Sequence, residues 1–223
     1  MHIPDGFLDQ YTALATYGVS VGIIGYAIRR GNLSDENRFA RAVTISAFIF
    51  VAQMIAWPIP GGTSLHLVGG ALAGILLGPW LGILAMTIVL IVQCLVFHDG
   101  GITALGANLL NMAIVAVLAG YITYRTIVRT LHRISSIRKR FIAGFMAGWI
   151  SLILAGTMTG LEIGIASIVL RRITYGLAVS LPIMSIWHGI LGVIEGSITG
   201  SILSYIGFKH PRVIEAEVQK VYE

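Results

Sequence analysis

Apolar residues run through this 223-residue sequence in long blocks, separated by short polar or glycine-rich stretches. A helix needs about 20 apolar residues to cross the hydrocarbon core of a bilayer, which is roughly 30 Å thick. The blocks predict seven membrane-spanning helices, of which the third is short: 11–28, 42–60, 65–78, 80–97, 103–124, 141–161 and 176–208. Gly78-Pro79 is expected to end the third helix, and Pro182 to separate an interfacial piece from the last. The predicted fold is therefore an all-α transmembrane bundle.

The composition agrees with this pattern. Hydrophobic residues make up 56% of the chain and charged residues only 11%, against about 25% charged residues in an average soluble domain. A soluble domain of this size cannot hide so much apolar surface, so a soluble enzyme, a disordered chain and a coiled coil are excluded. The single Cys94 excludes a disulfide framework within the chain. Residues 1–223 are expected to form one multi-pass domain in the cell membrane.

Basic residues predict the orientation, because cytoplasmic loops carry an excess of Lys and Arg. Thirteen of the 15 basic residues lie after the first predicted span, after the fifth, or in the tail: Arg29, Arg30, Arg38, Arg41, Arg125, Arg129, Arg133, Arg138, Lys139, Arg140, Lys209, Arg212 and Lys220. Seven spans place these three regions on one side, and Arg171 and Arg172 on the other. The N-terminus is then outside and the C-terminus inside. The positive charge indicates topology and no nucleic-acid partner.

The outer side collects histidines: His2 at the N-terminus, His66 in a glycine-rich turn and His98 in a loop. The first residues contain no Lys or Arg, so we expect no cleavable signal peptide and a retained Met1. A free amine, the residue-2 amide and Nδ1 of His2 can then bind one ion through fused five- and six-membered chelate rings. Such planar nitrogen geometry suits Ni(II) and Cu(II). His66 is the best candidate for the fourth corner. The alternative is that His2 is an incidental polar residue at a frayed terminus.

Other polar and small residues have two interpretations each. His98-Asp99 forms either a supporting carboxylate–imidazole pair or a polar loop at a helix end. His188 and Glu195 share a helix face and either support a metal or hold the bundle together by mutual hydrogen bonds. Asn108 and Asn111 either support the site or bridge helices. Small residues at four-residue spacing either pack within the bundle or face another membrane subunit; they are Gly70, Gly74, Gly78, Ala116, Gly120, Gly144 and Gly148.

No catalytic signature is present. The sequence contains no zinc-protease helix, no serine nucleophile elbow and no phosphate-binding loop, so the chain is not expected to be an enzyme or its own ATPase. Three other functions stay open at this point. They are capture of a vitamin, an intramembrane enzyme that uses His188 and Glu195 as acid and base, and a scaffold subunit without a ligand.

Several motifs together resemble the CbiM/NikM family of substrate-capture membrane components. The resemblance covers residues 1 to about 125 well and is looser beyond. It is carried by the start Met1-His-Ile-Pro-Asp-Gly-Phe-Leu, the block Phe48-Ile-Phe-Val-Ala-Gln, the turn Gly-Gly-Thr-Ser-Leu-His66-Leu-Val-Gly-Gly, the run Gly74-Ile-Leu-Leu-Gly-Pro79-Trp and the stretch His98-Asp-Gly-Gly-Ile-Thr-Ala-Leu-Gly-Ala-Asn108. Cobalt-type members often begin with His-Ile-Met-Glu-Gly, whereas this chain has His-Ile-Pro-Asp-Gly, which favours nickel.

The resemblance implies the capture subunit of an energy-coupling-factor importer for Ni(II), with Co(II) second. It implies a metal-binding segment at 1–10, an extra helix at 11–28 and a six-helix core at 42–208. Met1, His2 and His66 would bind the metal through four nitrogens. The implied partners are a transmembrane coupling subunit, cytoplasmic ATPase subunits and a small extra membrane subunit. Supporting roles are expected for Thr63, Ser64, His98, Asp99, Asn108, His188 and Glu195.

Overall fold

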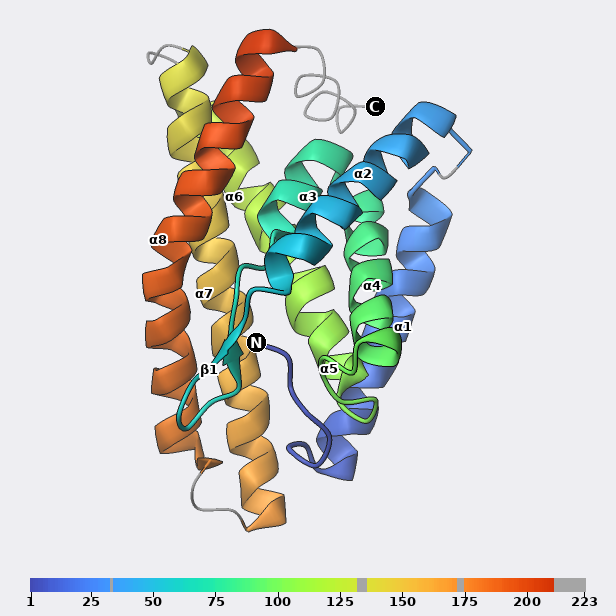
Figure 1. Cartoon of the computed structure of the whole chain (residues 1–223), viewed down its shortest axis with the longest axis vertical. Coiled ribbons are helices and arrows are strands. Elements are labelled where there is room, and N and C mark those ends of the chain that lie inside the picture. The colour runs from blue at the N-terminus through green and yellow to red at the C-terminus, as the bar shows by residue number, and fades with distance from the viewer. Residues whose placement is uncertain (33, 132–135, 172–174, 211–223) are drawn as a thin grey trace.

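The computed structural model is a helical bundle, and it describes residues 1–32, 34–131, 136–171 and 175–210 (Figure 1). Its elements are α1 (Gln10–Arg30), α2 (Glu36–Gln53), β1 (Trp57–Pro58), β2 (Ser64–Leu65), α3 (Gly70–Leu77), α4 (Pro79–Val96), α5 (Leu105–Asn108), the π-helix η1 (Leu109–Val115), α6 (Ala116–Thr130), α7 (Ser136–Leu170) and α8 (Leu177–Lys209). The predicted all-α class is confirmed, apart from one two-stranded antiparallel hairpin, β1–β2.

Within the described residues, five helical stretches are long and apolar enough to cross a membrane: Gln10–Arg30, Pro79–Val96, Leu105–Thr130, Ser136–Leu170 and Leu177–Lys209. The predicted segment 65–78 is shorter than expected, because only the eight residues of α3 are helical. The predicted segment 42–60 is shifted, since α2 begins at Glu36 after its N-cap Asp35 and ends at Gln53. Residues beyond Gln53 form the turn and hairpin that carry His66. These helices point to a membrane protein, and the count of seven spans stays a prediction.

Two expectations about helix breaks have different outcomes. Gly78 does separate α3 from α4: its φ of 80° favours glycine, and Pro79 follows at the first helical position of α4. The break expected at Pro182 is wrong, because α8 continues through it from Leu177 to Lys209. Pro182 lies in the second turn of the helix, and it does not separate an interfacial piece from the rest of α8.

The glycine-rich faces pack inside the bundle. A Cβ on Gly148 would lie 3.0 Å from Cα of Gly196, and a Cβ on Gly144 would lie 2.8 Å from Cα of Gly200, so α7 and α8 approach backbone to backbone. α3 packs equally closely on α6, where a Cβ on Gly120 would lie 2.4 Å from Cα of Ala71. The alternative that these faces await another membrane subunit is therefore wrong for these contacts.

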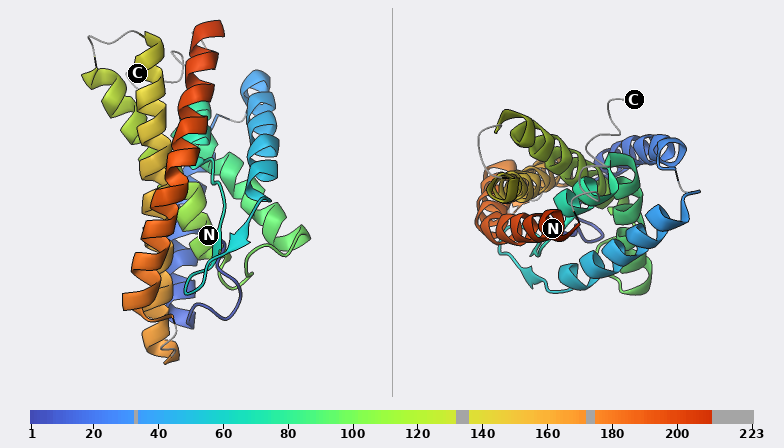
Figure 2. Two further views of the ribbon diagram at one scale, coloured as in Figure 1. Left: turned by 60° about the vertical axis from the view of Figure 1, so that its left-hand side comes forward. Right: turned by 90° about the horizontal axis from the view of Figure 1, so that it is seen from above.

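The two ends of the bundle differ in what they carry. The end of α1, the start of α2, the end of α6, the start of α7 and the end of α8 lie at one end (Figures 1 and 2). This agrees with the three basic regions facing the same side, although Arg133, Arg172, Arg212 and Lys220 lie outside the described residues. The other end carries the β1–β2 hairpin and the 97–104 loop. Residues 1–9 fold back between these, so that the N-terminus lies near the middle of the bundle (Figure 1).

Candidate metal site

The N-terminal segment is held inside the bundle by its backbone. Asn108 at the end of α5 accepts from the amide N–H of Ile3 (2.8 Å) and donates to the Ile3 carbonyl (3.2 Å). The Ile3 carbonyl also accepts from the N–H of Gly101 at 2.8 Å. Asp5 caps the 102–104 turn through the N–H and hydroxyl of Thr103 (2.7 and 2.6 Å), contacts that lower the pKa of the Asp5 carboxyl. These contacts fix residues 1 and 2 deep inside the protein.

The structure brings Met1, His2 and His66 together. Met1 and His66 are fully buried and His2 is 4% exposed. The imidazole rings of His2 and His66 stack, with centroids 4.6 Å apart and an angle of 22° between their planes. The Met1 amine donates to the carbonyl of Ser64 and to its hydroxyl (2.6 Å). An incidental polar residue at a frayed terminus does not fit this burial, so that interpretation of His2 is wrong.

Burial also changes the protonation of these groups. It lowers the pKa of the Met1 amine well below its usual 8.0, against the opposing charge of Asp99. It lowers the pKa of His2 to about 3, helped by the nearby amine, and it lowers the pKa of His66 as well. Burial therefore favours the neutral forms of the amine and of both imidazoles, which are the forms that bind a metal.

Each of these neutral groups uses its hydrogens on protein oxygens and keeps a nitrogen lone pair. Two contacts to Ser64 take both hydrogens of a neutral amine. Nδ1 of His66 lies 2.8 Å from the Leu67 carbonyl and must donate to it, so Nε2 carries the lone pair. Nδ1 of His2 and Nε2 of His66 make no hydrogen bond with the described part of the chain. A set of nitrogen donors thus converges in a buried place.

The turn that carries His66 is fastened on both sides. Glu195 of α8 accepts from the amide N–H groups of Val68 (2.7 Å) and Gly69 (2.9 Å). Gln53 at the end of α2 donates to the Val68 carbonyl at 2.6 Å. Gly69 has a φ of 74°, which favours glycine at this turn. Sequence reasoning missed Gln53 as an anchor, although a glutamine among apolar residues is itself a signal of a buried polar contact.

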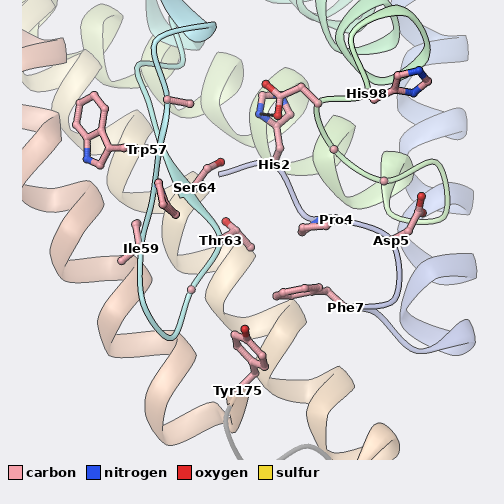
Figure 3. Close-up of a pocket in the computed structure, with 16 residues that line it drawn as sticks. His2, Pro4, Asp5, Phe7, Trp57, Ile59, Thr63, Ser64, His98 and Tyr175 are labelled. Carbon is pink, nitrogen blue, oxygen red and sulfur yellow. Dashed lines mark ion pairs between the residues drawn. The ribbon is translucent and has the colours of Figure 1, made fainter.

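Most of the other predicted supporting residues lie near this site, and some do not contact it as expected. Ser64 contacts the amine, whereas Thr63 approaches only the Met184 sulfur, at 4.0 Å. Asp99 faces His2, with its Oδ1 3.4 Å from Nδ1. His98 is exposed, and its ring points away from His2 (Figure 3). The supporting pair is therefore Asp99 with His2, and the predicted His98–Asp99 pair is wrong.

His188 and Glu195 are both buried, yet their hydrogen bonds go elsewhere. His188 donates from Nδ1 to the Met184 carbonyl at 2.7 Å, which leaves Nε2 without a hydrogen-bond partner among the described residues. Glu195 holds the turn after β2. The mutual hydrogen bonds expected between these residues are absent from the described hydrogen bonds. His188 lies close enough to the Met1 amine and to His66 to interact electrostatically with both.

Asn111 bridges helices instead of supporting the site. Its amide donates to Glu162 (2.6 Å) and to Thr159 (3.1 Å), both on α7. Of the two interpretations of the asparagines, Asn108 therefore fits the first and Asn111 the second. Within the described residues, no group of three or more His, Cys, Asp or Glu side chains is arranged to hold a metal ion. A metal at His2 and His66 would therefore need ligands beyond these side-chain types.

An open hollow of about 640 Å³ leads from the surface to His2 (Figure 3). Its floor includes His2, Ser64 and Asp99, and its walls include the aromatic rings of Phe7, Trp57 and Tyr175. A cation that enters this hollow meets two carboxylates, those of Asp5 and Asp99, and no Lys or Arg among the residues that line it.

The sequence matches, over residues 2–213, the CbiM family, described as "Cobalt uptake substrate-specific transmembrane region". The chain belongs to the CbiM family. It is 52% identical over 215 residues to a putative fused nickel transport protein NikMN of Archaeoglobus fulgidus. The aligned region covers 96% of this chain and 68% of that protein. It is 28% identical over 221 residues to a putative cobalt transport protein CbiM of Halobacterium salinarum, which covers 96% of each chain.

Solved structures give the same result. A truncated transition metal transporter has a TM-score of 0.86 and 32% sequence identity to this CbiM-family chain, over 94% of this chain and 99% of that one. The resemblance of the sequence to this family is thus confirmed. The intramembrane enzyme and the ligand-free scaffold lose their support, since the relatives are named as metal transport proteins.

Proposed function

We propose that this CbiM-family protein is the substrate-capture subunit of an energy-coupling-factor importer, and that its cargo is Ni(II), with Co(II) as the second choice. The ligands are the Met1 amine, the amide nitrogen of His2, Nδ1 of His2 and Nε2 of His66. The observation that carries this proposal is that the hydrogens of the amine and of both imidazoles are used on protein oxygens. The lone pairs left over belong to the nitrogens that the chelate requires.

The chemistry of these donors favours nickel or copper over zinc. Amine, amide and Nδ1 form fused five- and six-membered rings that lie in one plane, and Ni(II) and Cu(II) accept square-planar nitrogen ligands. Zn(II) prefers a tetrahedron, which three nitrogens in a plane do not provide. The relative from Archaeoglobus fulgidus is named as a putative nickel transport protein, which supports nickel as the cargo. Binding releases the amide proton, so the affinity must fall as the pH falls.

In this proposal the ion enters through the acidic hollow and passes Asp99 on its way to His2. The hollow lies at the end of the bundle away from the basic regions, which is the outer end if the positive-inside rule holds. The proposal includes seven spans in the plasma membrane, with the N-terminus outside and the C-terminus inside. The helix at Gln10–Arg30 is the extra helix, and it positions residue 1 inside the core formed by residues 42–208.

The partners follow from the same proposal. Release to the inside requires energy, and the sequence has no phosphate-binding loop. This energy would come from partner subunits. They are a transmembrane coupling subunit, cytoplasmic ATPase subunits and a small extra membrane subunit. Exposed apolar side chains on α1 and α8, such as Leu14 and Ile190, offer surface for lipid and for such partners.

Blocking the Met1 amine tests the ligand set. An N-formyl group retained on Met1 turns the amine into an amide, so the five-membered ring loses its amine donor. Calorimetric titration should then lose Ni(II) binding, while the thermal unfolding temperature of the metal-free protein stays close to that of the unblocked chain. The matched control is the same protein after enzymatic removal of the formyl group, which should bind Ni(II) normally.

Two results would overturn the proposal. Full retention of Ni(II) binding by the N-formylated chain would exclude the amine as a ligand. An organic molecule that co-purifies with the protein, together with unchanged ligand binding by a His2→Ala variant, would establish the vitamin-capture alternative. Elemental analysis of the purified protein distinguishes these outcomes without any assumption about the ligands.

A further inference from the structure

The His2 imidazole has two possible neutral forms, and only one of them fits the proposed site. A neutral imidazole carries one hydrogen, on Nδ1 or on Nε2, and the nitrogen without hydrogen is the one that binds a metal. The six-membered ring with the residue-2 amide requires Nδ1. The hydrogen must therefore be on Nε2, which requires a group of the protein that accepts a hydrogen bond from Nε2.

Gln93 faces Nε2 of His2. It lies in α4, its side chain is fully buried, and its Oε1 is 3.1 Å from Nε2. A carbonyl oxygen only accepts, so this contact requires the hydrogen on Nε2 and leaves the lone pair on Nδ1. The backbone carbonyl of Gln93 also accepts from the N–H of Asp99 at 2.9 Å. One residue thus orients the ring and the carboxylate-bearing loop beside it.

Asp99 favours the other tautomer of His2, with the hydrogen on Nδ1. Its Oδ1 lies 3.4 Å from Nδ1 of His2, on the other side of the ring from Gln93. Without Gln93, a carboxylate at this distance would favour the form with hydrogen on Nδ1, which blocks the metal-binding nitrogen. With Gln93 in place, a lone pair and a carboxylate face each other, and a divalent cation is attracted by both.

We propose that Gln93 is a positioning residue that selects the metal-binding tautomer of His2 against the pull of Asp99. Gln93 acts through His2 and does not line the hollow through which the ion would arrive. The inference rests on the proposed function, because it explains why Nδ1 is available. Groups that orient a metal-binding histidine typically change metal affinity by roughly 10- to 100-fold when they are removed.

Two substitutions of Gln93 separate orientation from packing. Gln93→Met fills similar space and cannot accept from an N–H, whereas Gln93→Glu retains an acceptor at the same place. For the tautomer, the matched control is Gln53→Met: Gln53 is also a buried glutamine, but it contacts the Val68 carbonyl and has no hydrogen bond to His2 among the described residues. Because Gln53 holds the turn that carries His66, this variant is not a control for the Ni(II) affinity. All variants are made in the full chain, with Met1 as the first residue.

The first measurement is nitrogen-15 NMR of histidine-labelled, metal-free protein, with the His2 signals assigned by their loss in His2→Ala. The parent chain, Gln93→Glu and Gln53→Met should show the hydrogen on Nε2. Gln93→Met should shift it towards Nδ1. Adding Asp99→Asn to Gln93→Met should return it to Nε2, because an asparagine amide can donate to Nδ1.

The second measurement is calorimetric titration with Ni(II) ions. Gln93→Met should weaken binding by roughly 10- to 100-fold, and Gln93→Glu should bind at least as tightly as the parent chain. A parent-like tautomer and affinity in Gln93→Met would overturn the inference. If Gln93→Met does not fold, a move of the hydrogen to Nδ1 in Gln93→Glu overturns it instead. Failure of the parent chain to bind Ni(II) would contradict the proposed function, whereas the tautomer in the metal-free protein is read independently of it.

Discussion

The α7–α8 pair and the N-terminal segment are both buried, yet they are held by different forces. The two long helices, Ser136–Leu170 and Leu177–Lys209, meet backbone to backbone through glycine faces. Hydrogen bonds such as that from the Trp149 indole to the Gly189 carbonyl add to this close packing. The segment 1–9 has no regular structure and is held by hydrogen bonds with Asn108, Ser64 and Gln93. Close packing gives a stable frame, and directed hydrogen bonds give donors of defined orientation. Changes to the two regions should therefore have separable effects.

The largest effect on metal binding is expected from His66→Ala. The variant removes the fourth nitrogen and leaves the helices unchanged, since His66 lies in the turn between β2 and α3. Ni(II) binding should fall below the range of calorimetry, with a change of only a few degrees in the thermal unfolding temperature. Parent-like binding would mean that another group completes the site, and His188 would be the first to examine.

The opposite pattern is expected from Gly196→Ala on α8. A Cβ at this position would lie 2.5 Å from the carbonyl oxygen of Phe145, so the helices must separate. Overpacking of this kind costs typically about 1–3 kcal/mol of stability. The unfolding temperature should fall, while folded protein still binds Ni(II) within about threefold of the parent affinity. Selective loss of affinity without loss of stability would contradict the separation of frame and site.

Asn108→Ala should loosen the N-terminal segment. It removes both side-chain hydrogen bonds to the backbone of Ile3, and each buried group left without a partner costs about 1–3 kcal/mol. An increase of roughly 30-fold in the dissociation constant for Ni(II), equal to about 2 kcal/mol, is expected. Proteolysis of residues 1–9 should become faster. The control Asn111→Ala, at the contact with α7, should lower stability and leave proteolysis of this segment unchanged.

Glu195→Gln should have a smaller effect. The carboxylate accepts two N–H groups, and an amide can match only one of them with an acceptor. The turn that carries His66 should shift, with a loss of roughly tenfold in Ni(II) affinity. An affinity equal to that of the parent chain would show that Gln53 alone suffices to hold this turn.

The pH dependence is the finest test of the buried site. Because burial lowers the pKa of the Met1 amine below 8.0 and that of His2 to about 3, neither group needs to lose a proton at pH 7. Only the amide proton is released, so about one proton should leave per Ni(II) bound. Calorimetry in buffers of different ionisation enthalpy measures this number. A value near two would mean that the amine keeps its ordinary pKa, and affinity unchanged down to about pH 5 would contradict the ligand set.

The hydropathy pattern predicted the helical bundle better than the details of the metal site. Long apolar blocks require a helical bundle whatever their details, and the histidines near one end were enough to suggest a metal. The sequence indicated the glycine-rich turn at His66 but not the β1–β2 hairpin, because the apolar residues up to position 60 resemble the end of a span. It did not indicate the role of Gln93 either, since the partner of a buried glutamine depends on three-dimensional packing. The break predicted at Pro182 is wrong because α8 continues through this proline in its second turn.

X-ray absorption at the nickel edge of the Ni(II)-loaded protein tests the central claim most directly. We expect four nitrogen neighbours in a square plane, with no sulfur. In the chain that retains N-formyl-Met1, this signature should disappear. A six-coordinate shell dominated by oxygen, or a nickel–sulfur distance, would contradict the amine–amide–imidazole site.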